Sequence, residues 1–228
     1  MCQLDCVMSK RHIIAIAGFK GSGKDTIGEI LKKKYGFAST SFAKSLKNAL
    51  CAMFGWQPHM MEGVSPESRQ WREQPDPYWS AQFNRNITPR NMMQEFGTEV
   101  VRGNLLDSFW ISATKKELLN ISYPKSVVVT DARFRNELNM IRSLNGITIR
   151  VVRNTEPAWF AQAKRVNKHS GWIKKALLWI YPQVRKIHPS ERDWIGYDFD
   201  YIVYNNGTLA DLEKQIDHIM DILNKQSR

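Results

Sequence analysis

The sequence predicts an α/β protein built on a five-stranded parallel sheet with flanking helices, and three observations lead to this fold class. Short apolar runs alternate with longer helical patterns along the chain, which is typical of a doubly wound sheet. Several of these runs, such as residues 13–17, are apolar at every position, as expected of strands that are buried on both faces. A glycine-rich stretch stands directly between the first run and the first helical pattern.

The predicted elements follow in order along the chain. Strands are expected at residues 13–17, 38–42, 126–130, 147–152 and 201–204. Apolar residues recur at helical spacing in the segments that separate them, which predicts helices at residues 25–35, 44–54, 89–101, 107–119, 133–144 and 209–224. The segment 57–87 is rich in proline and tryptophan, and we expect an ordered loop with short helical turns there. Thr88 and Pro89 then suit the start of the next helix, as its cap and its first residue.

Length and composition fit one α/β domain with an excursion. The chain has 228 residues, of which 43% are hydrophobic, and no apolar run approaches the ~20 residues that cross a membrane. Residues 1–11 lack the apolar core of a signal peptide and are expected to form a loose tail. Cys2, Cys6 and Cys51 have neither metal-binding nor redox spacing, which predicts a reducing, cytoplasmic compartment, that of the host cell if the protein is viral.

The charge balance indicates a polyanionic partner. The net charge is +11 and the isoelectric point is near 9.6. Such a balance suits nucleotides, nucleic acid or anionic lipid, and charge alone does not choose among them.

The glycine-rich stretch has the residues and the context of a phosphate-binding loop. It reads GFKGSGKDT at residues 18–26, after an apolar strand and before a helical pattern. Backbone N–H groups of such a loop, together with the positive end of the helix dipole, can surround phosphate oxygens. Gly18, Gly21 and Gly23 permit backbone angles that a side chain would forbid. Lys24 supplies a positive charge for the outer phosphates.

The loop departs from the common pattern at the residue after the lysine. Asp25 stands where Ser or Thr usually places a hydroxyl on Mg²⁺, and Thr26 comes next, as in many nucleoside monophosphate kinases. A carboxylate would repel the phosphates unless a cation intervenes. Asp25 is therefore expected to contact Mg²⁺, directly or through water, or to be held by a basic residue. A helix N-terminal acid favoured by the dipole is the alternative.

The third strand ends in a second group of charged residues. Ligands of open parallel sheets bind beyond the carboxyl ends of the strands, so Asp131 is placed to hold Mg²⁺ or its waters. Asp131 is alternatively the N-cap of the helix 133–144, and both roles are compatible. Arg133 can reach a phosphate from the same edge. Arg135 and Glu137 are expected on a solvated helix face.

Two further helices carry candidate anion ligands. Lys44 and Lys47 follow the second strand and can meet an acceptor phosphate, or are simply exposed lysines on an amphipathic helix. Arg90 and Gln94 are four residues apart and share a helix face. An arginine fork suits a phosphate and a glutamine amide can read a base edge, although such a pair also occurs on ordinary polar surfaces.

The ordered series of motifs resembles the deoxynucleoside monophosphate kinases of tailed bacteriophages, within the P-loop nucleoside monophosphate kinase group. The similar pieces are Gly23-Lys24-Asp25-Thr26, Phe42-Ala43 with Leu46-Lys47, Pro89-Arg90 with Gln94 and Gly97-Thr98-Glu99, Asp131-Ala132-Arg133 with Asn136-Glu137, Val151-Val152-Arg153, His188-Pro189-Ser190-Glu191 and Asn205-Asn206-Gly207-Thr208-Leu209. They cover about residues 12–153 and 188–224. The resemblance implies a P-loop kinase fold that transfers the γ-phosphoryl group of ATP to a deoxynucleoside monophosphate, and it suggests a homodimer.

The resemblance also implies roles for individual residues. ATP would be bound by Gly18, Lys20, Gly21, Ser22, Gly23, Lys24, Asp25 and Thr26. Mg²⁺ would lie near Asp25, Thr26 and Asp131, and the catalytic set would be Lys24, Asp25, Asp131 and Arg133. The acceptor would be bound by Lys44, Lys47, Arg69, Arg72, Arg90 and Gln94. The core would span residues 12–153, with the acceptor segment at about 57–104, and residues 199–228 would form the last strand and helix.

The segment 154–198 is a departure from that family. Arg153 and His188 are 35 positions apart, where the family has a short stretch. Residues 158–190 hold seven Lys or Arg, no acidic residue and five aromatic residues. A basic lid over the phosphates would use Arg153, Arg165, Arg185 and Arg192. The alternatives are an amphipathic helix at 172–181 that docks on a membrane or partner, a nucleic-acid patch, or plain core packing.

The sequence is compatible with other functions. P-loop kinases of other small acceptors, of the dephospho-coenzyme A, sugar acid or phosphomevalonate type, share the loop. A non-catalytic protein that binds nucleic acid under nucleotide control would use the basic insertion. The accepted base and sugar are not determined by the sequence, although Trp71, Tyr78 and Trp79 are candidates for excluding ribose. His188 is expected to bond a backbone group rather than act as a base.

Overall fold

A computed structural model describes residues 11–105, 108–122 and 125–225, and it divides into two compact units. The first unit comprises residues up to 40 together with 120–228, and the second comprises residues 41–119. The expected tail 1–11 lies, except for its last residue, outside the described residues. Among the described residues, no helix is both long enough and apolar enough to span a membrane.

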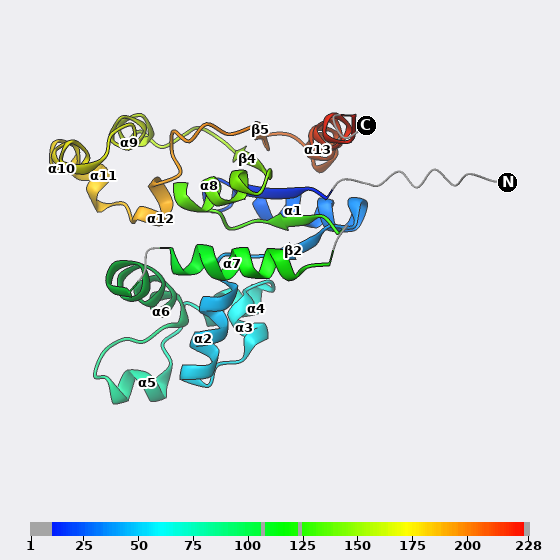
Figure 1. Ribbon diagram of the computed structural model, residues 1–228. Coiled ribbons are helices and arrows are strands. Elements are labelled where there is room, and N and C mark those ends of the chain that lie inside the picture. Colours follow the sequence, from blue (N-terminus) through cyan, green and yellow to red (C-terminus); the bar gives the residue numbers. More distant parts are fainter. Residues whose placement is uncertain (1–10, 106–107, 123–124, 226–228) are drawn as a thin grey trace. The chain divides into compact units, whose positions relative to one another are not determined.

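The first unit is built on a parallel sheet of five strands in the order β2-β3-β1-β4-β5 (Figure 1). The strands are β1 (Ile13–Ala17), β2 (Ala38–Thr40), β3 (Val127–Val129), β4 (Ile147–Val152) and β5 (Tyr201–Tyr204). All residues of β1 and β3 are buried, because each of these strands pairs on both sides and is covered on both faces. The predicted fold class is therefore confirmed.

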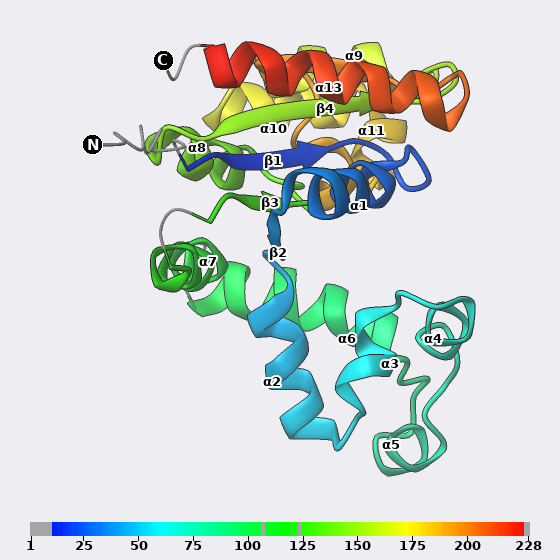
Figure 2. The ribbon, with the colours of Figure 1, turned by 90° about the vertical axis from the view of Figure 1, so that its right-hand side faces the viewer.

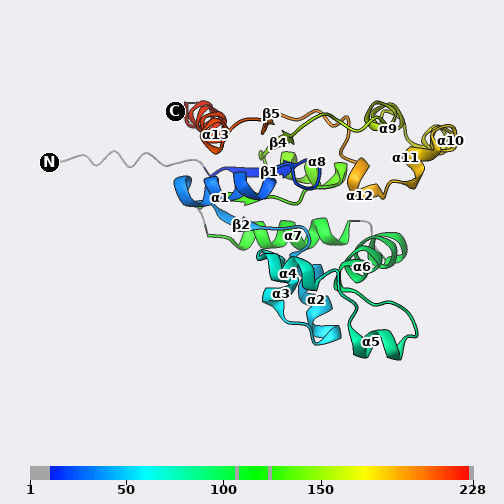
Figure 3. The ribbon, with the colours of Figure 1, turned by 180° about the vertical axis from the view of Figure 1, so that it is seen from behind.

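Helices cover both faces of this sheet. Helix α1 (Lys24–Tyr35) and the C-terminal helix α13 (Leu209–Lys225) contribute to one apolar core with the strands. Helix α8 (Arg135–Ser143) packs against β1 and β4, and Figures 1 and 3, drawn from opposite sides, show it across the sheet from α1. The apolar stripes of α1 and α13 explain why these two helices form where the sequence pattern predicts them.

The insertion after β4 folds into four short helices within the described residues of the first unit. These are α9 (Phe160–Asn167), α10 (Gly171–Ile180), α11 (Pro182–Lys186) and α12 (Pro189–Arg192). Ala163, Val166, Val184 and Trp194 are buried, so the insertion has a packed interior. Helix α10 has no buried residue. It corresponds to the amphipathic helix expected at 172–181.

The second unit is helical (Figure 2). It contains α2 (Lys44–Phe54), α3 (Pro58–Glu62), α4 (Pro66–Trp71), α5 (Pro77–Gln82), α6 (Pro89–Gln94) and α7 (Phe109–Asn120). Proline stands at the first position of α3, α4, α5 and α6, where its missing N–H costs nothing. The short helical turns expected in 57–87 correspond to α3, α4 and α5.

One helix prediction differs from the structure. The expected helix 89–101 is α-helical only through Gln94 and continues as a π-helix, Glu95–Leu105. Apolar spacing identifies the buried face of a helix, but it does not distinguish a 3.6-residue turn from the wider turn of a π-helix. The start at Thr88 is as predicted, with its hydroxyl accepting from the backbone N–H of Asn91 at 3.0 Å.

Candidate functional site

The glycine-rich loop connects β1 to α1 at the carboxyl edge of the sheet. Gly18 has φ +153°, and a Cβ at this position would lie 2.6 Å from the carbonyl oxygen of Val151. The loop therefore approaches the end of β4 as closely as only glycine allows. Ser22 N donates to Phe19 O at 3.1 Å, and this turn gives the loop its curvature. The strand–loop–helix context that the sequence predicts is present.

Lys24 is the first residue of α1 and folds back over the loop. Its Nζ donates to the carbonyl oxygens of Gly18 at 2.9 Å and Phe19 at 2.8 Å. Burial, and then the positive charge of Arg133, lower the pKa of Lys24 from 10.5 to about 8. Lys24 thus lies in a partly desolvated environment, and a bound phosphate group would favour its charged form.

Three carboxylates act on Lys24 in the opposite direction. Asp25, Glu191 and Asp131 all favour its charged form, so they come from three different segments to one place. Carboxylate and hydroxyl oxygens are the ligands that Mg²⁺ accepts, and Mg²⁺ in kinases needs only one or two carboxylates beside the substrate phosphates. No group of three or more His, Cys, Asp or Glu side chains able to hold a metal occurs among the described residues. Asp25, Thr26 and Asp131 carry oxygen donors of the kind that Mg²⁺ accepts.

The segment after β3 corrects two sequence predictions. Helix α8 begins at Arg135 with Phe134 as its N-cap, so Asp131 lies before the cap and the capping interpretation is wrong. Glu137 does the capping instead, accepting from the backbone N–H groups of Arg133 at 2.7 Å and Phe134 at 3.0 Å. Glu137 is buried, not solvated, because it satisfies these two donors.

Arg135 also differs from its expected place on a solvated face. Its guanidinium donates to the carbonyl oxygens of Asp193 at 3.0 Å and Ile195 at 2.9 Å, which ties α8 to the end of the insertion. Arg133, in contrast, forms an ion pair with Glu191, in the short helix α12. In the sequence, Glu191 stands out only as part of the motif at residues 188–191. The pairing of distant charges could not be read from their spacing.

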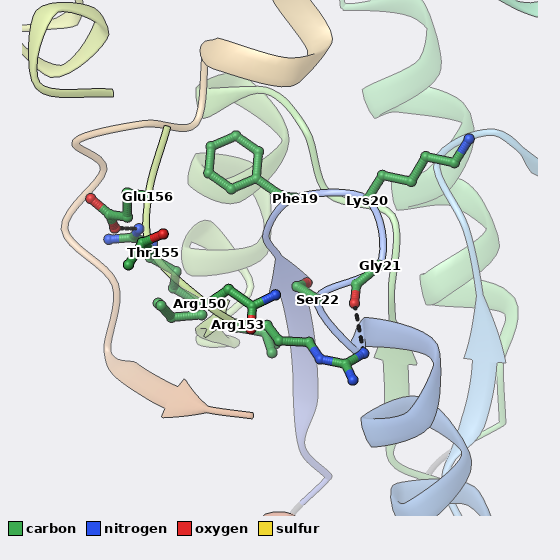
Figure 4. A pocket seen from close by; sticks show the side chains of 11 residues that line it. Phe19, Lys20, Gly21, Ser22, Arg150, Arg153, Thr155 and Glu156 are labelled. Atoms are coloured by element: carbon green, nitrogen blue, oxygen red, sulfur yellow. Dashed lines mark hydrogen bonds and ion pairs between the residues drawn. The ribbon is translucent and has the colours of Figure 1, made fainter. Parts of the chain in front are cut away.

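The phosphate-binding loop contacts the insertion through Phe19. The ring of Phe19 lies edge-on to Trp194, with ring centroids 5.0 Å apart, and contacts Trp159 and Phe160 at 5.8 and 6.1 Å. A pocket lies beside the loop, and Figure 4 shows the side chains that line it. Its wall comprises residues 19–22 and 150–156. The insertion therefore begins at the loop rather than at a remote surface.

The four arginines expected in a lid have different environments. Arg153 NH1 donates to Gly21 O at 3.3 Å, at the rim of the pocket (Figure 4). Arg165 NH1 donates to Tyr181 OH at 3.0 Å, and Arg185 lies over the ring of Trp179 at 4.6 Å. Arg192 is buried, and its Nε donates to Ile187 O at 2.9 Å. Burial lowers the pKa of Arg192. Its side chain connects two segments of the insertion and is not exposed for contact with a phosphate.

His188 has the structural role expected of it. Its Nδ1 lies 2.7 Å from Ser190 Oγ and accepts from the backbone N–H of Ser190 at 3.3 Å. This bond caps α12, the helix that carries Glu191.

The predicted acceptor residues all belong to the second unit. Arg69, Arg72 and Arg90 (the arginine cluster) act on one another there: burial lowers the pKa of Arg72, the charges of Arg90 and Arg69 lower it further, and Glu73 and Glu62 oppose this shift. The Nε of Arg72 is buried and has no hydrogen-bond partner among the described residues. The buried Nε of Arg72 is therefore an unsatisfied donor beside two further arginines and the carboxylates of Glu73 and Glu62.

The remaining acceptor candidates are at the edge of this cluster or outside it. Lys47 pairs with Glu62 at 2.7 Å, and Glu62 acts electrostatically on Arg72. Lys44 pairs with Glu117 at 2.5 Å, on another part of the same unit. Arg90 pairs with Glu73 at 3.0 Å. Gln94 is exposed at the end of α6.

Taken with its sheet order, the loop defines the class of protein. A parallel five-stranded sheet with a lysine-bearing glycine-rich loop after its first strand is characteristic of the P-loop kinases. The family model described as deoxynucleotide monophosphate kinase matches residues 77–169. A relative from Acanthamoeba polyphaga mimivirus, named "Putative deoxynucleotide monophosphate kinase", is 31% identical over 152 residues, which are 62% of this chain and 74% of that protein. The chain belongs to the deoxynucleotide monophosphate kinase family and is an enzyme of that type.

Solved structures of other kinases are also similar to the chain. A shikimate kinase from Aquifex aeolicus is 13% identical, with a TM-score of 0.41 and coverage of 92% of this chain and 96% of that one. A dephospho-CoA kinase from Campylobacter jejuni is 16% identical, with a TM-score of 0.40 and coverage of 94% and 98%.

Proposed function

We propose that the protein transfers the γ-phosphoryl group of ATP to a deoxynucleoside monophosphate, giving the deoxynucleoside diphosphate and ADP. Membership of the deoxynucleotide monophosphate kinase family supports the reaction. The single observation that supports the chemistry is Lys24, a half-buried cation that folds over a glycine-rich loop, where Arg133 and three carboxylates act on it electrostatically. Phosphate groups of ATP bound in this loop would favour the charged form of the lysine.

In this proposal the loop binds the phosphates of ATP. The backbone N–H groups of residues 18–26 surround the phosphate oxygens, and Lys24 leaves its two carbonyl partners to contact the outer phosphates. Asp25, Thr26 and Asp131 would hold Mg²⁺, directly or through water. When bound, Mg²⁺ would neutralise the charge that develops on the transferred group. The oxygen-donor chemistry of these residues supports this assignment.

Arg133 is proposed to contact the transferred phosphoryl group. Its charge already acts on Lys24, so the two cations lie near each other without a bound anion. In the structure Arg133 is paired with Glu191. A phosphate would compete with Glu191 for the guanidinium, and charge-assisted bonds of this kind are among the strongest in proteins.

The arginine cluster of the second unit is proposed to bind the phosphate of the acceptor. Arg72 carries the buried unpaired Nε, and Arg69 and Arg90 complete the positive charge. Lys44 and Lys47 would add charge at a greater distance, and Gln94 would contact the base. The acceptor phosphate is already a nucleophile near neutral pH, so positioning and charge neutralisation suffice and no strong general base is required.

The insertion 154–198 is proposed to act as a lid. Phe19 of the loop packs against Trp159, Phe160 and Trp194 of the insertion. These contacts support the role, because a movement of the insertion would change the packing of the loop. Arg153, Arg165 and Arg185 are exposed, so their guanidinium groups are accessible to a bound phosphate in this proposal. The docking alternative is favoured by α10, whose Trp172 and Trp179 are 77% and 75% exposed.

The function is tested by an assay that couples ADP release to a spectroscopic signal, with Mg²⁺·ATP and a panel of deoxy- and ribonucleoside monophosphates. Turnover with at least one deoxynucleotide is expected, and the panel identifies the accepted bases. Dephospho-coenzyme A and sugar acids belong in the same panel. Turnover with one of those and with no nucleotide would contradict the proposal.

A further inference from the structure

The loop that follows β5 makes a direct contact with the phosphate-binding loop. Asn205 is the first residue after β5, and its backbone N–H donates to Val152 O at 2.8 Å, so it continues the pairing of β5 with β4. Its side-chain Nδ2 donates to the carbonyl oxygen of Ser22 at 2.8 Å. One residue thus connects the end of β4, the end of β5 and the glycine-rich loop.

The bond to Ser22 O constrains a peptide unit that matters for phosphate binding. In a trans peptide the carbonyl oxygen and the following N–H point in opposite directions across one rigid plane. The amide of Asn205 holds the carbonyl of Ser22, so the N–H of Gly23 is held pointing away from Asn205. The orientation of a loop donor is therefore set by a side chain 183 positions away in the sequence.

Gly23 fits closely against the same side chain. A Cβ built on Gly23 would overlap the Nδ2 atom of Asn205, and Gly23 has φ +102°. Glycine at this position is therefore required by the backbone angle and also by the approach of Asn205. By contrast Gly21, with φ +78°, has no atom within 4 Å of the corresponding position.

Among the described residues, two side chains from outside the loop donate to its backbone. Arg153 donates to Gly21 O at 3.3 Å from an exposed position. Asn205 is partly buried and its bond of 2.8 Å is the shorter of the two. The neighbouring Asn206 makes no such contact: its Oδ1 accepts from the backbone N–H of Asn154 at 2.7 Å.

We propose that Asn205 is a positioning residue for ATP, which holds the Ser22–Gly23 peptide so that its N–H is presented to the phosphates. This inference rests on the proposed role of the loop in binding ATP. Without the amide, the Ser22–Gly23 peptide rotates more freely, because glycine itself resists rotation little. ATP then has to order the loop when it binds, and its affinity falls.

The test compares Asn205→Ala with Asn206→Ala as a matched control from the same loop. Calorimetric titration with Mg²⁺·ATP is expected to give a dissociation constant about three- to tenfold higher for Asn205→Ala, the effect of one lost hydrogen bond. Asn206→Ala should stay within about twofold of the unaltered protein. The KM of the nucleotide acceptor should be unchanged in both variants, because neither side chain belongs to the second unit.

A second variant separates hydrogen bonding from packing. Asn205→Leu has a similar volume but no donor, so it should lose ATP affinity as Asn205→Ala does. Affinity equal to that of the unaltered protein in either variant would overturn the proposal. Equal losses of ATP and acceptor affinity, with a lower melting temperature, would also overturn it, since they would indicate a general structural role. Because ATP binding is measured directly, an absence of kinase turnover would contradict the proposed function without deciding the role of Asn205.

Discussion

At the scale of the residue, charge explains most of the site. Lys24 is half-buried, its charged form is disfavoured by burial and by Arg133, and the carboxylates of Asp25, Glu191 and Asp131 act in the opposite direction. In the proposed function, Lys24 is thus positioned over the loop before the substrate arrives. The same reasoning applies to Arg72 in the second unit, whose Nε is buried and unpaired among the described residues.

Lys24→Ala is expected to lower kcat by at least about 10²-fold, because it removes the positive charge that stabilises the transferred phosphoryl group. The fold should be retained, since Lys24 makes its hydrogen bonds only to loop carbonyls. Steady-state kinetics together with circular dichroism provide the check. Near-normal turnover in a folded variant would remove Lys24 from the mechanism.

Arg72→Ala is expected to raise the KM of the deoxynucleotide by at least about tenfold while leaving the KM of ATP almost unchanged, because charge-assisted bonds to a phosphate are lost. The matched control is Arg85→Ala in the same unit, which loses only an exposed ion pair with Glu95. Kinetics with each substrate varied in turn separate the two effects. Equal increases in both KM values would place Arg72 outside the acceptor site.

At the scale of the element, the sequence pattern predicts the sheet better than the connections. The strands β1, β4 and β5 have the predicted bounds, and in β1 the continuous apolar run is buried at every position, as expected of a strand inside a covered sheet. The predicted strand 38–42 ends at Thr40, because Lys44 N bonds back to Ser41 O and turns the chain into α2. Local periodicity carries no information on such turns.

The N-terminal cap of α8 is a feature that the sequence does not predict. Aspartate before a helical pattern is a common N-cap, yet Glu137 caps this helix and leaves Asp131 at the strand end. Capping by a glutamate within the first turn depends on which donors are buried, and burial follows from tertiary packing. The predicted position of Asp131 near the loop lysine was nevertheless correct, since it followed from the edge at which parallel strands end.

Glu137→Ala is expected to lower the free energy of unfolding by about 1–3 kcal/mol, because two partly buried backbone donors lose their acceptor, a buried carboxylate. Glu29→Ala is the control, since Glu29 forms only an exposed pair with Lys32 and its loss should change stability by less than about 0.5 kcal/mol. Urea denaturation of both variants gives the comparison. Similar losses for the two would show that the capping bonds contribute little.

The double variant Trp172→Ser, Trp179→Ser tests what the outer face of α10 does. These side chains are 77% and 75% exposed, so the account predicts an unchanged melting temperature and kinetic constants within about twofold. Steady-state kinetics at saturating ATP and deoxynucleotide measure the effect. A tenfold loss of kcat would contradict this and would assign the face to closure over the substrates.

At the scale of the whole molecule, the two proposed binding sites belong to different units. The first unit carries the loop, the carboxylates and Arg133, and the second carries the arginine cluster. The sequence indicates the loop through its motif, whereas Arg69 and Arg72 lie in a segment expected to be an ordered loop and follow only from the family resemblance. The sequence does not indicate that Arg133 pairs with Glu191, that Asn205 bonds the loop, or that Arg192 is buried. Each of those depends on contacts of residues far apart in the sequence.

The measurement that tests the account most directly is the fate of a labelled γ-phosphoryl group. ATP labelled at the γ-position is incubated with Mg²⁺, the protein and each deoxynucleoside monophosphate, and the products are separated. The account predicts that the label appears in a deoxynucleoside diphosphate and that Lys24→Ala abolishes this transfer. Label found only in inorganic phosphate or remaining in ATP, with every acceptor tested, would contradict it.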